Sequence, residues 1–356
     1  MWRLLLFFSQ IVLIVSAKAL LDKEEQEEQE EPICKISDGY NVCQNERVLV
    51  KVTRTFKDRW YFNDQLNLNN MDLLAIQEGA FKNVTVMHTL NLNVGNRISV
   101  LTRGSFRGLP NLKILNLNKN VVLLSEHMFA ELSQLQALSL SFNKINSIPK
   151  NSFAGLPNLL WLFLNKNDIP TIDKDSFSNL NPGLFFLSLI SSKILYVAPG
   201  AFAGLTELNT LQLNHNQLQI LPNGIFRGLN KLKFLHLDYN LITSVSRMLL
   251  SDLVNLQELH LEHNEIRTLE PGTFRDLSKL ENLQLGGNKL SHIKADTFTG
   301  LYKLKDLALS DNNIHTVDNG AFSDLVELQS LDLTSNNITE IDKKISGCLS
   351  KVALFL

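Results

Sequence analysis

The chain has 356 residues, of which 44% are hydrophobic and 20% are charged, and its formal net charge is −2. This apolar content is ample for a large core, and typical domain sizes suggest two domains unless the chain is one repeat array. A nearly neutral chain argues against nucleic-acid binding, which needs a concentrated basic face.

Residues 1–19 have the pattern of a secretory signal peptide. Arg3 supplies the positive start and LLLFFSQIVLIV the apolar run, and cleavage is expected after Ala19 or after Ala17. The apolar run is shorter than the roughly 20 residues that a membrane-spanning helix needs, and no later stretch approaches that length. We therefore predict a secreted, extracellular protein without a membrane span, with an uncleaved anchor as the alternative.

The segment that follows, residues 20–32, is predicted to be an acidic linker. Its sequence DKEEQEEQEE, residues 22–31, contains seven acidic residues and one basic residue. Such a run cannot bury apolar surface and stays solvated. An interaction tail is the alternative interpretation.

From residue 63 to residue 351 the leucines recur with a period of 24. The segments LNTLQLNHNQLQILPNGIFRGL (208–229), LQELHLEHNEIRTLEPGTFRDL (256–277) and LENLQLGGNKLSHIKADTFTGL (280–301) fit the template L-x-x-L-x-L-x-x-N-x-L-x-x-L-x-x-x-x-F-x-x-L-x-x. Repeats one to twelve start near Asn63, Met87, Leu112, Leu135, Leu159, Leu184, Leu208, Leu232, Leu256, Leu280, Leu304 and Leu328. The pattern is identified as the leucine-rich repeat of extracellular proteins. The resemblance implies an α/β solenoid, a leucine-rich repeat horseshoe with a parallel concave β-sheet and an irregular or 3-10 convex side.

Two positions of the template are expected inside the solenoid. The ninth-position asparagine must satisfy its polar atoms, and it can bond the turn backbones of its own and the adjacent repeat. The phenylalanine is expected to form a buried spine on the convex side. The ladder consists of Asn96, Asn120, Asn143, Asn167, Ser192, Asn216, Asn240, Asn264, Asn288, Asn312 and Asn336. The spine consists of Phe81, Phe106, Phe129, Phe153, Phe177, Phe202, Phe226, Leu250, Phe274, Phe298 and Phe322.

Residues 33–62 resemble the cysteine-bearing N-terminal cap of this family, although many members have four cysteines there. In an exported chain a Cys34–Cys43 disulfide is expected. Cys348 is too far along the solenoid to join them, so it either forms an intermolecular disulfide or is buried as a thiol. Two sequons make Asn83 and Asn337 candidate N-glycosylation sites.

The segment GCLSKVALFL, which includes the C-terminal tail 352–356, resembles no multi-cysteine cap. Three alternatives remain open for this end of the array. The tail folds over the last repeat, a partner covers that repeat, or the gene product is truncated.

The sequence contains no motif that would make the protein an enzyme. We find no G-x-S-x-G elbow, H-E-x-x-H pair, phosphate-binding loop or C-x-x-C. No catalytic residue and no cofactor is therefore predicted.

Four of the eight histidines fall in repeats seven to nine at outward strand positions. They are His215, His236, His260 and His263, and Asp238, Glu258 and Glu262 are nearby in the template. Such a cluster is typical of a metal site or a pH-sensitive contact. The alternative is a polar sheet surface that happens to use histidine, and we favour that alternative and predict no metal.

The third, fifth, seventh and eighth positions of each repeat face outward, because strand side chains alternate. These positions are mainly polar in the first and last three repeats but include aromatic residues in the middle repeats. A contiguous exposed apolar patch usually marks a binding surface, and aromatic residues concentrate binding energy. A locally deformed coil that buries these rings is the alternative. The candidate ligand-binding residues are Phe142, Trp161, Phe163, Phe186, Ile190, Phe234, His236, Tyr239 and His260.

The repeat style resembles Toll-type receptor ectodomains and the secreted leucine-rich immune proteins of insects, although no C-terminal coiled-coil heptads follow. The resemblance implies recognition of a protein or peptide ligand on the concave face, in innate immunity or at cell surfaces. A homo- or hetero-oligomer is possible, and no nucleic-acid partner is expected. The alternatives are a matrix or adhesion protein of the small leucine-rich type, or a fragment of a receptor ectodomain.

Overall fold

The computed structural model describes residues 31–55, 64–82, 84–338 and 353–355. The predicted signal peptide, most of the acidic linker, Asn83 and Cys348 lie outside these described residues. Among the residues described, no helix is long and apolar enough to cross a membrane. The chain divides into two compact units, an N-terminal unit of Met1–Asp168 with Asn179–Asn181 and a C-terminal unit of Ile169–Ser178 with Pro182–Leu356.

The N-terminal unit begins with a four-stranded cap. Its strands are β1 (Ile33–Ser37), β2 (Tyr40–Asn45), β3 (Val48–Arg54) and β5 (Ala75–Ile76). The first three strands are antiparallel, and β5 joins β3 in parallel. Val48 of β3 packs with Leu74, Ala75 and Val100, so the cap and the first repeats share buried apolar residues.

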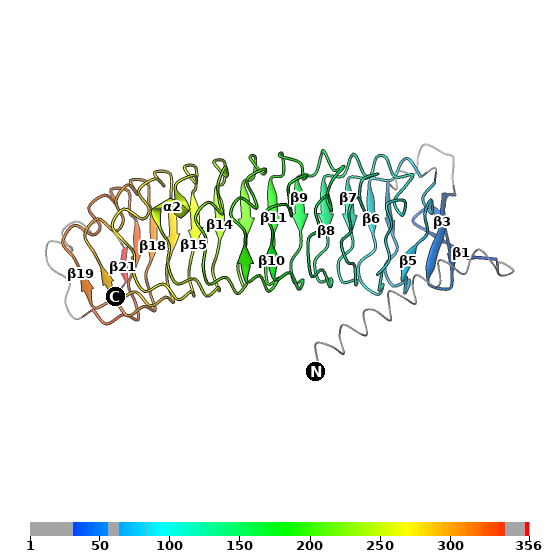
Figure 1. Ribbon diagram of the computed structural model, residues 1–356. Helices are drawn as coiled ribbons and strands as arrows, with labels where there is room; N and C mark the ends of the chain where they lie inside the picture. Colours follow the sequence, from blue (N-terminus) through cyan, green and yellow to red (C-terminus); the bar gives the residue numbers. More distant parts are fainter. Residues whose placement is uncertain (1–30, 56–63, 83, 339–352, 356) are drawn as a thin grey trace. The chain divides into compact units, whose positions relative to one another are not determined.

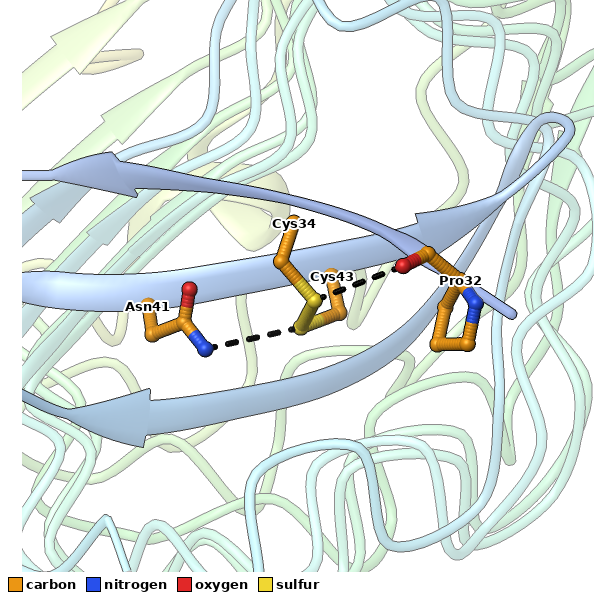
Figure 2. The surroundings of a disulfide bond; sticks show 4 residues. All are labelled: Pro32, Cys34, Asn41 and Cys43. Atoms are coloured by element: carbon orange, nitrogen blue, oxygen red, sulfur yellow. Dashed lines mark hydrogen bonds between the residues drawn. A yellow bond between two sulfur atoms is a disulfide. The ribbon is translucent and has the colours of Figure 1, made fainter.

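Cys34 and Cys43 lie directly opposite each other on β1 and β2, with their Cα atoms 4.0 Å apart. Their sulfur atoms form a disulfide, as the sequence predicted, and we call this bond the cap disulfide (Figure 2). The side-chain amide of Asn41 lies 3.7 Å from the Cys43 sulfur on one side of it. The cap disulfide therefore ties the edge strand β1 to the rest of the cap.

Each repeat contributes one short strand, and within each unit these strands pair in parallel with their neighbours (Figure 1). In the N-terminal unit they are β4 (Gln65–Asn67), β6 (Thr89–Asn91), β7 (Ile114–Asn116), β8 (Ala137–Ser139) and β9 (Trp161–Phe163). In the C-terminal unit they are β11 (Phe186–Ser188), β13 (Thr210–Gln212), β14 (Phe234–His236), β15 (Glu258–His260), β16 (Asn282–Gln284), β18 (Asp306–Ala308) and β20 (Ser330–Asp332). The middle residue of every one of these strands is a buried leucine. The predicted fold class, a leucine-rich repeat solenoid of about twelve turns, is confirmed.

The predicted C-terminal tail provides one further strand. Strand β21 (Ala353–Phe355) pairs in parallel with β20, with Leu354 opposite Leu331. Leu333 donates its backbone N–H to the carbonyl of Phe355 at 2.8 Å. The tail therefore continues the strand pairing beyond repeat twelve, which is the first of the alternatives considered for it.

The segments that connect successive strands consist mainly of turns, as expected for the irregular side of the repeat. Two pairs of short parallel strands occur there, β10 (Thr171–Ile172) with β12 (Tyr196–Val197) and β17 (His292–Ile293) with β19 (Thr316–Val317). The single-turn helix α2 (Arg247–Leu250) replaces the usual phenylalanine turn, and Ser246 caps it by accepting a hydrogen bond from the Leu249 N–H. Leu250 occupies the spine position and is buried.

The predicted asparagine ladder is confirmed, and Asn240 shows its geometry. Its side-chain amide donates to the carbonyls of Leu213 in the preceding repeat and Leu237 in its own repeat, both at 3.0 Å. Its side-chain oxygen accepts from the N–H of Leu218 in the preceding repeat, also at 3.0 Å. Each asparagine rung thus satisfies backbone groups of its own and the preceding repeat, whereas the Ser192 hydroxyl donates to the Ile190 carbonyl of its own repeat.

The phenylalanine spine is also confirmed. All ten spine phenylalanines are buried, with side-chain exposure of 6% or less. Neighbouring rings stack within each unit, for example Phe274 on Phe298 at 6.1 Å between ring centroids. The leucines, the asparagines and this spine fix the inside of the repeat and leave the outward strand positions free to vary.

Candidate functional site

The outward side of the repeat strands, which we call the strand face, carries the candidate residues. It consists of the first and last residues of each three-residue strand and of the seventh and eighth positions that follow. The eighth position has a left-handed backbone, with φ near 55° at Lys119, Phe142, Lys166, Ser191, His215, Tyr239, His263, Asp311 and Ser335. This conformation costs a residue with a side chain roughly 1–2 kcal/mol, so a bulky ring there is unusual.

In the N-terminal unit, Phe142 occupies this strained position with φ 58° and remains 46% exposed. The ammonium groups of Lys119 and Lys166, from the same position of the two neighbouring repeats, lie 5.8 and 4.8 Å from the centre of its ring. Both distances are within reach of a cation–π interaction. Phe142 is therefore flanked by two lysines at an exposed position.

Trp161 and Phe163 are the first and last residues of β9, and the buried Leu162 lies between them. They lie opposite Ala137 and Ser139 of β8. Trp161 is 38% exposed and Phe163 is half-buried, whereas Leu162 has no exposed surface. The two rings thus lie outside the leucine core, and their role as ligand contacts stays a prediction.

In the C-terminal unit, Tyr239 is the centre of a column of three stacked rings. Its ring centroid lies 4.4 Å from that of His215 and 4.3 Å from that of His263, with interplanar angles of 10° and 25°. These separations are close to the spacing of adjacent strands, about 4.8 Å. Gly287 follows at the same position in repeat ten, where a Cβ atom would collide with the His263 ring. The tyrosine is 45% exposed despite this stacking.

A second pair of rings lies on β14 and β15. His236 and His260 are opposite each other in the strand register, and their rings stack with 4.6 Å between centroids. Asp238 follows two residues after His236 and is largely buried. Ligand atoms of His236, Asp238 and His260 all lie within 4.8 Å of one another. The structure thus brings two predicted ligand-binding residues, His236 and His260, together with the carboxylate of Asp238.

Two glutamates on β15 and just after it shape the electrostatics of this pair. Glu262 has one carboxylate oxygen 3.1 Å from His260 Nδ1, and a Glu258 oxygen is 3.8 Å from His260 Nε2. Burial and the neighbouring charge of His260 lower the pKa of His236 to about 4. Burial also acts to lower the pKa of His260, but the hydrogen bond and charge of Glu262 outweigh it and raise that pKa. Burial and the charge of Glu262 raise the pKa of Asp238.

The remaining candidates are less closely grouped. Phe186, Ile190 and Phe234 are half-buried on the strand face of the C-terminal unit. Thr210 on β13 lies opposite both Phe186 and Phe234, so a threonine strand separates the two phenylalanines. Phe186 and Phe234 therefore do not lie on adjacent strands, and their role as ligand contacts stays a prediction.

Four residues that contact the candidate rings are not among the predicted ligand-binding residues: His215, His263, Lys119 and Lys166. The sequence does contain the signal that finds them. All four occupy the eighth position of repeats that directly neighbour Phe142 or Tyr239, and residues at equal positions of adjacent repeats lie about one strand spacing apart.

Comparison with known proteins places the repeats in a family. The family model described as Leucine rich repeat matches residues 64–120, 94–145, 133–189, 182–242, 232–290 and 278–338. Keratocan from Bos taurus is 28% identical over 155 residues, which cover 42% of this chain and 42% of keratocan. Podocan from Mus musculus is 29% identical over 187 residues, which cover 50% of this chain and 30% of podocan. The chain thus spans less than half the length of these curated relatives.

Solved structures show the same fold. A crystal structure of a TLR13–ssRNA13 complex matches with a TM-score of 0.71 and 27% identity, covering 82% of this chain and 43% of that one. A crystal structure of an internalin, inlF, from Listeria monocytogenes matches with a TM-score of 0.63 and 26% identity, covering 82% of this chain and 80% of that one.

Proposed function

Because the chain belongs to the leucine-rich repeat family, we propose that it is a secreted, non-enzymatic binding protein that recognises a protein or peptide partner on its strand face. The observation that carries this proposal is the ring column of His215, Tyr239 and His263. It presents a large amphipathic ring at the surface, in a backbone conformation that disfavours such a ring.

A purely structural role would not require a tyrosine at position 239. At the eighth position, glycine, asparagine or aspartate adopts the left-handed backbone at lower cost than tyrosine, and Gly287 and Asp311 occupy it in later repeats. Tyr239 is also not needed to fill the core, because the buried leucines, Asn240 and the spine already do so. An exposed aromatic ring held rigidly by two stacked neighbours is well suited to anchor a partner.

The charged residues near the ring column indicate which class of partner it would bind. Asp238, Glu258 and Glu262 make this part of the strand face acidic, which disfavours a nucleic-acid backbone and favours a protein segment with basic or aromatic side chains. The TLR13 structure is a complex with ssRNA13, so RNA is the competing class that an experiment must include.

Two biological settings fit such a protein. The Toll-type likeness supports the predicted role in innate immunity or cell-surface recognition. The similarity to keratocan and podocan, which are small leucine-rich proteoglycans, supports an extracellular-matrix protein as a second candidate. A paired capture experiment can distinguish these settings by the identity of the partner.

The test uses the secreted chain as bait in fluid or tissue extract from its source. Wild-type bait is compared with Tyr239→Asn bait and with a control, Met248→Ser, which changes an exposed residue of α2 away from the strands. We expect a protein that wild type and the control retain and that Tyr239→Asn loses. A partner bound equally by all three baits would refute the ring column as the site, and retention of RNA instead of protein would refute the partner class.

A further inference from the structure

We propose that His236, Asp238 and His260 form a binding site for a divalent transition-metal ion, with Zn²⁺ as the expected occupant. The three residues, which we call the metal triad, lie on β14, just after β14, and on β15. This inference does not depend on the proposed function, because it concerns an ion bound by this chain alone.

The geometry of the metal triad is close to that of a bound ion. Its ligand atoms lie within 4.8 Å of one another. Zinc binds imidazole nitrogen and carboxylate oxygen at about 2.0–2.2 Å, so two ligands of one tetrahedral ion are roughly 3.3–3.6 Å apart. The two rings are stacked with 16° between their planes, so each would turn about its side-chain torsions to point a nitrogen lone pair at one ion. The backbone need not move, since the strand register already holds the two histidines opposite each other.

The surroundings of His260 resemble those of a metal-bound histidine. Such a histidine usually has its second ring nitrogen on a carboxylate, which fixes the orientation of the ring. Glu262 lies 3.1 Å from His260 Nδ1 and would have this positioning role, leaving Nε2 for the ion. Glu258, 3.8 Å from Nε2, is near enough to supplement the ligand set.

The charge balance of the site also favours a cation. Asp238 is largely buried, and one carboxylate oxygen of Glu262 is buried without a hydrogen-bond partner. Within the part of the chain that the structure describes, neither these two carboxylates nor Glu258 forms an ion pair with a lysine or arginine. The basic group beside Glu262 and Glu258 is His260, whereas Asp238 is buried, and a buried carboxylate is stabilised by a paired charge or by a metal ion.

The donor set indicates which ion. Two imidazoles and one carboxylate suit zinc and neighbouring transition metals, whereas calcium and magnesium prefer oxygen ligands. Three protein ligands leave a fourth position, and where Glu258 does not take it that position is open. A water molecule, or a side chain of another protein, would complete the coordination.

The test is calorimetric titration of ZnCl₂ into the tag-free, chelator-treated secreted chain. We expect one equivalent of Zn²⁺ to bind to wild type and none at this site in His236→Gln or His260→Gln. Glu262→Gln should retain the site but bind about 10–100-fold more weakly, as expected for a residue that orients a ligand. CaCl₂ titrated under the same conditions should produce no binding.

A matched control keeps the test specific. His292 on β17 lies 2.7 Å from Asp318, and among the described residues this pair is not part of a group of three metal ligands, so His292→Gln should bind Zn²⁺ as wild type does. Far-ultraviolet circular dichroism should show that all variants fold. The proposal is overturned if wild type binds no Zn²⁺, or if folded His236→Gln and His260→Gln bind it as tightly as wild type and His292→Gln do.

Discussion

Replacing Tyr239 by asparagine should affect affinity and stability very differently. The change removes two ring stacks, on His215 at 4.4 Å and on His263 at 4.3 Å, each worth about 0.5–1.5 kcal/mol. It also relieves a left-handed tyrosine at φ 52°, which costs roughly 1–2 kcal/mol and which asparagine tolerates better. The two effects oppose each other, so we expect the free energy of unfolding to fall by no more than about 2 kcal/mol.

The affinity for a strand-face partner should fall much further. Loss of a central aromatic anchor typically costs about 2 kcal/mol or more, which is roughly a 30-fold increase in Kd. Urea unfolding and calorimetric binding to the captured partner measure the two quantities on the same protein. A loss of stability of about 3 kcal/mol or more would mean that the tyrosine is a structural residue, and our reasoning about the ring column would be wrong.

The adjacent residue offers a control with the opposite outcome. Asn240 is buried, and its side chain makes hydrogen bonds to the backbone of two repeats. Asn240→Ala leaves several buried backbone groups without partners and should destabilise the protein by about 3 kcal/mol. The affinity of the molecules that remain folded should be unchanged. If Tyr239→Asn and Asn240→Ala changed the free energy of unfolding and the affinity by equal amounts, the distinction between buried structural positions and binding positions on the strand face would be wrong.

Three further predictions concern the N-terminal unit. Replacing both cysteines of the cap disulfide by serine should destabilise the cap by about 2.5 kcal/mol, seen as faster amide hydrogen exchange in β1 and β2 but not in β14 and β15. The hydrogen bond from Arg47 lowers the pKa of Asp72. The Arg47–Asp72 pair therefore stabilises the folded state at pH values above 3.8, the ordinary pKa, and this stabilisation is lost as the pH falls through the lowered pKa. Wild type and Asp72→Asn should therefore differ in free energy of unfolding at pH 6, by no more than about 1 kcal/mol, and converge toward pH 2 in urea titrations. Leu162→Ala should cost about 3 kcal/mol by opening a cavity in the core, and Trp161→Ala should cost less in the same thermal-unfolding assay.

The inside of the solenoid could be predicted because one template constrains every repeat. Leucine, asparagine and phenylalanine each recur at a fixed position and pack beside the same residue type of the adjacent repeat. The period alone therefore predicts that Asn240 belongs to the asparagine ladder and Phe274 to the phenylalanine spine. Even the exception was predictable, since Leu250 stands in for the missing phenylalanine and is buried. The burial and backbone hydrogen bonding of these positions depend on the repeat rather than on individual neighbours.

The strand face could be predicted only in part, because the template leaves its side-chain directions open. The alternation of β9 places Trp161 and Phe163 outward, and the shared eighth position places two lysines beside Phe142, but neither pattern predicts how closely the ammonium groups approach its ring. The approach of Glu262 to His260 is likewise a matter of rotamers at a turn. The separation of Phe186 from Phe234 by Thr210, by contrast, followed from strand order and could have been found by aligning third positions.

The two proposals use neighbouring but distinct columns of the same strand face. The ring column follows the eighth position of repeats seven to nine, and the metal triad follows the fifth and seventh positions of repeats eight and nine. Tyr239 directly follows Asp238 in the chain, yet strand alternation and the left-handed backbone give their side chains different neighbours. An ion at the triad would present an open coordination position beside the ring column, where a partner's carboxylate or imidazole could bind it. A partner that binds equally well with and without Zn²⁺ would then use the ring column alone, whereas Zn²⁺-dependent binding lost in both Tyr239→Asn and His236→Gln would mean that the two columns form one interface.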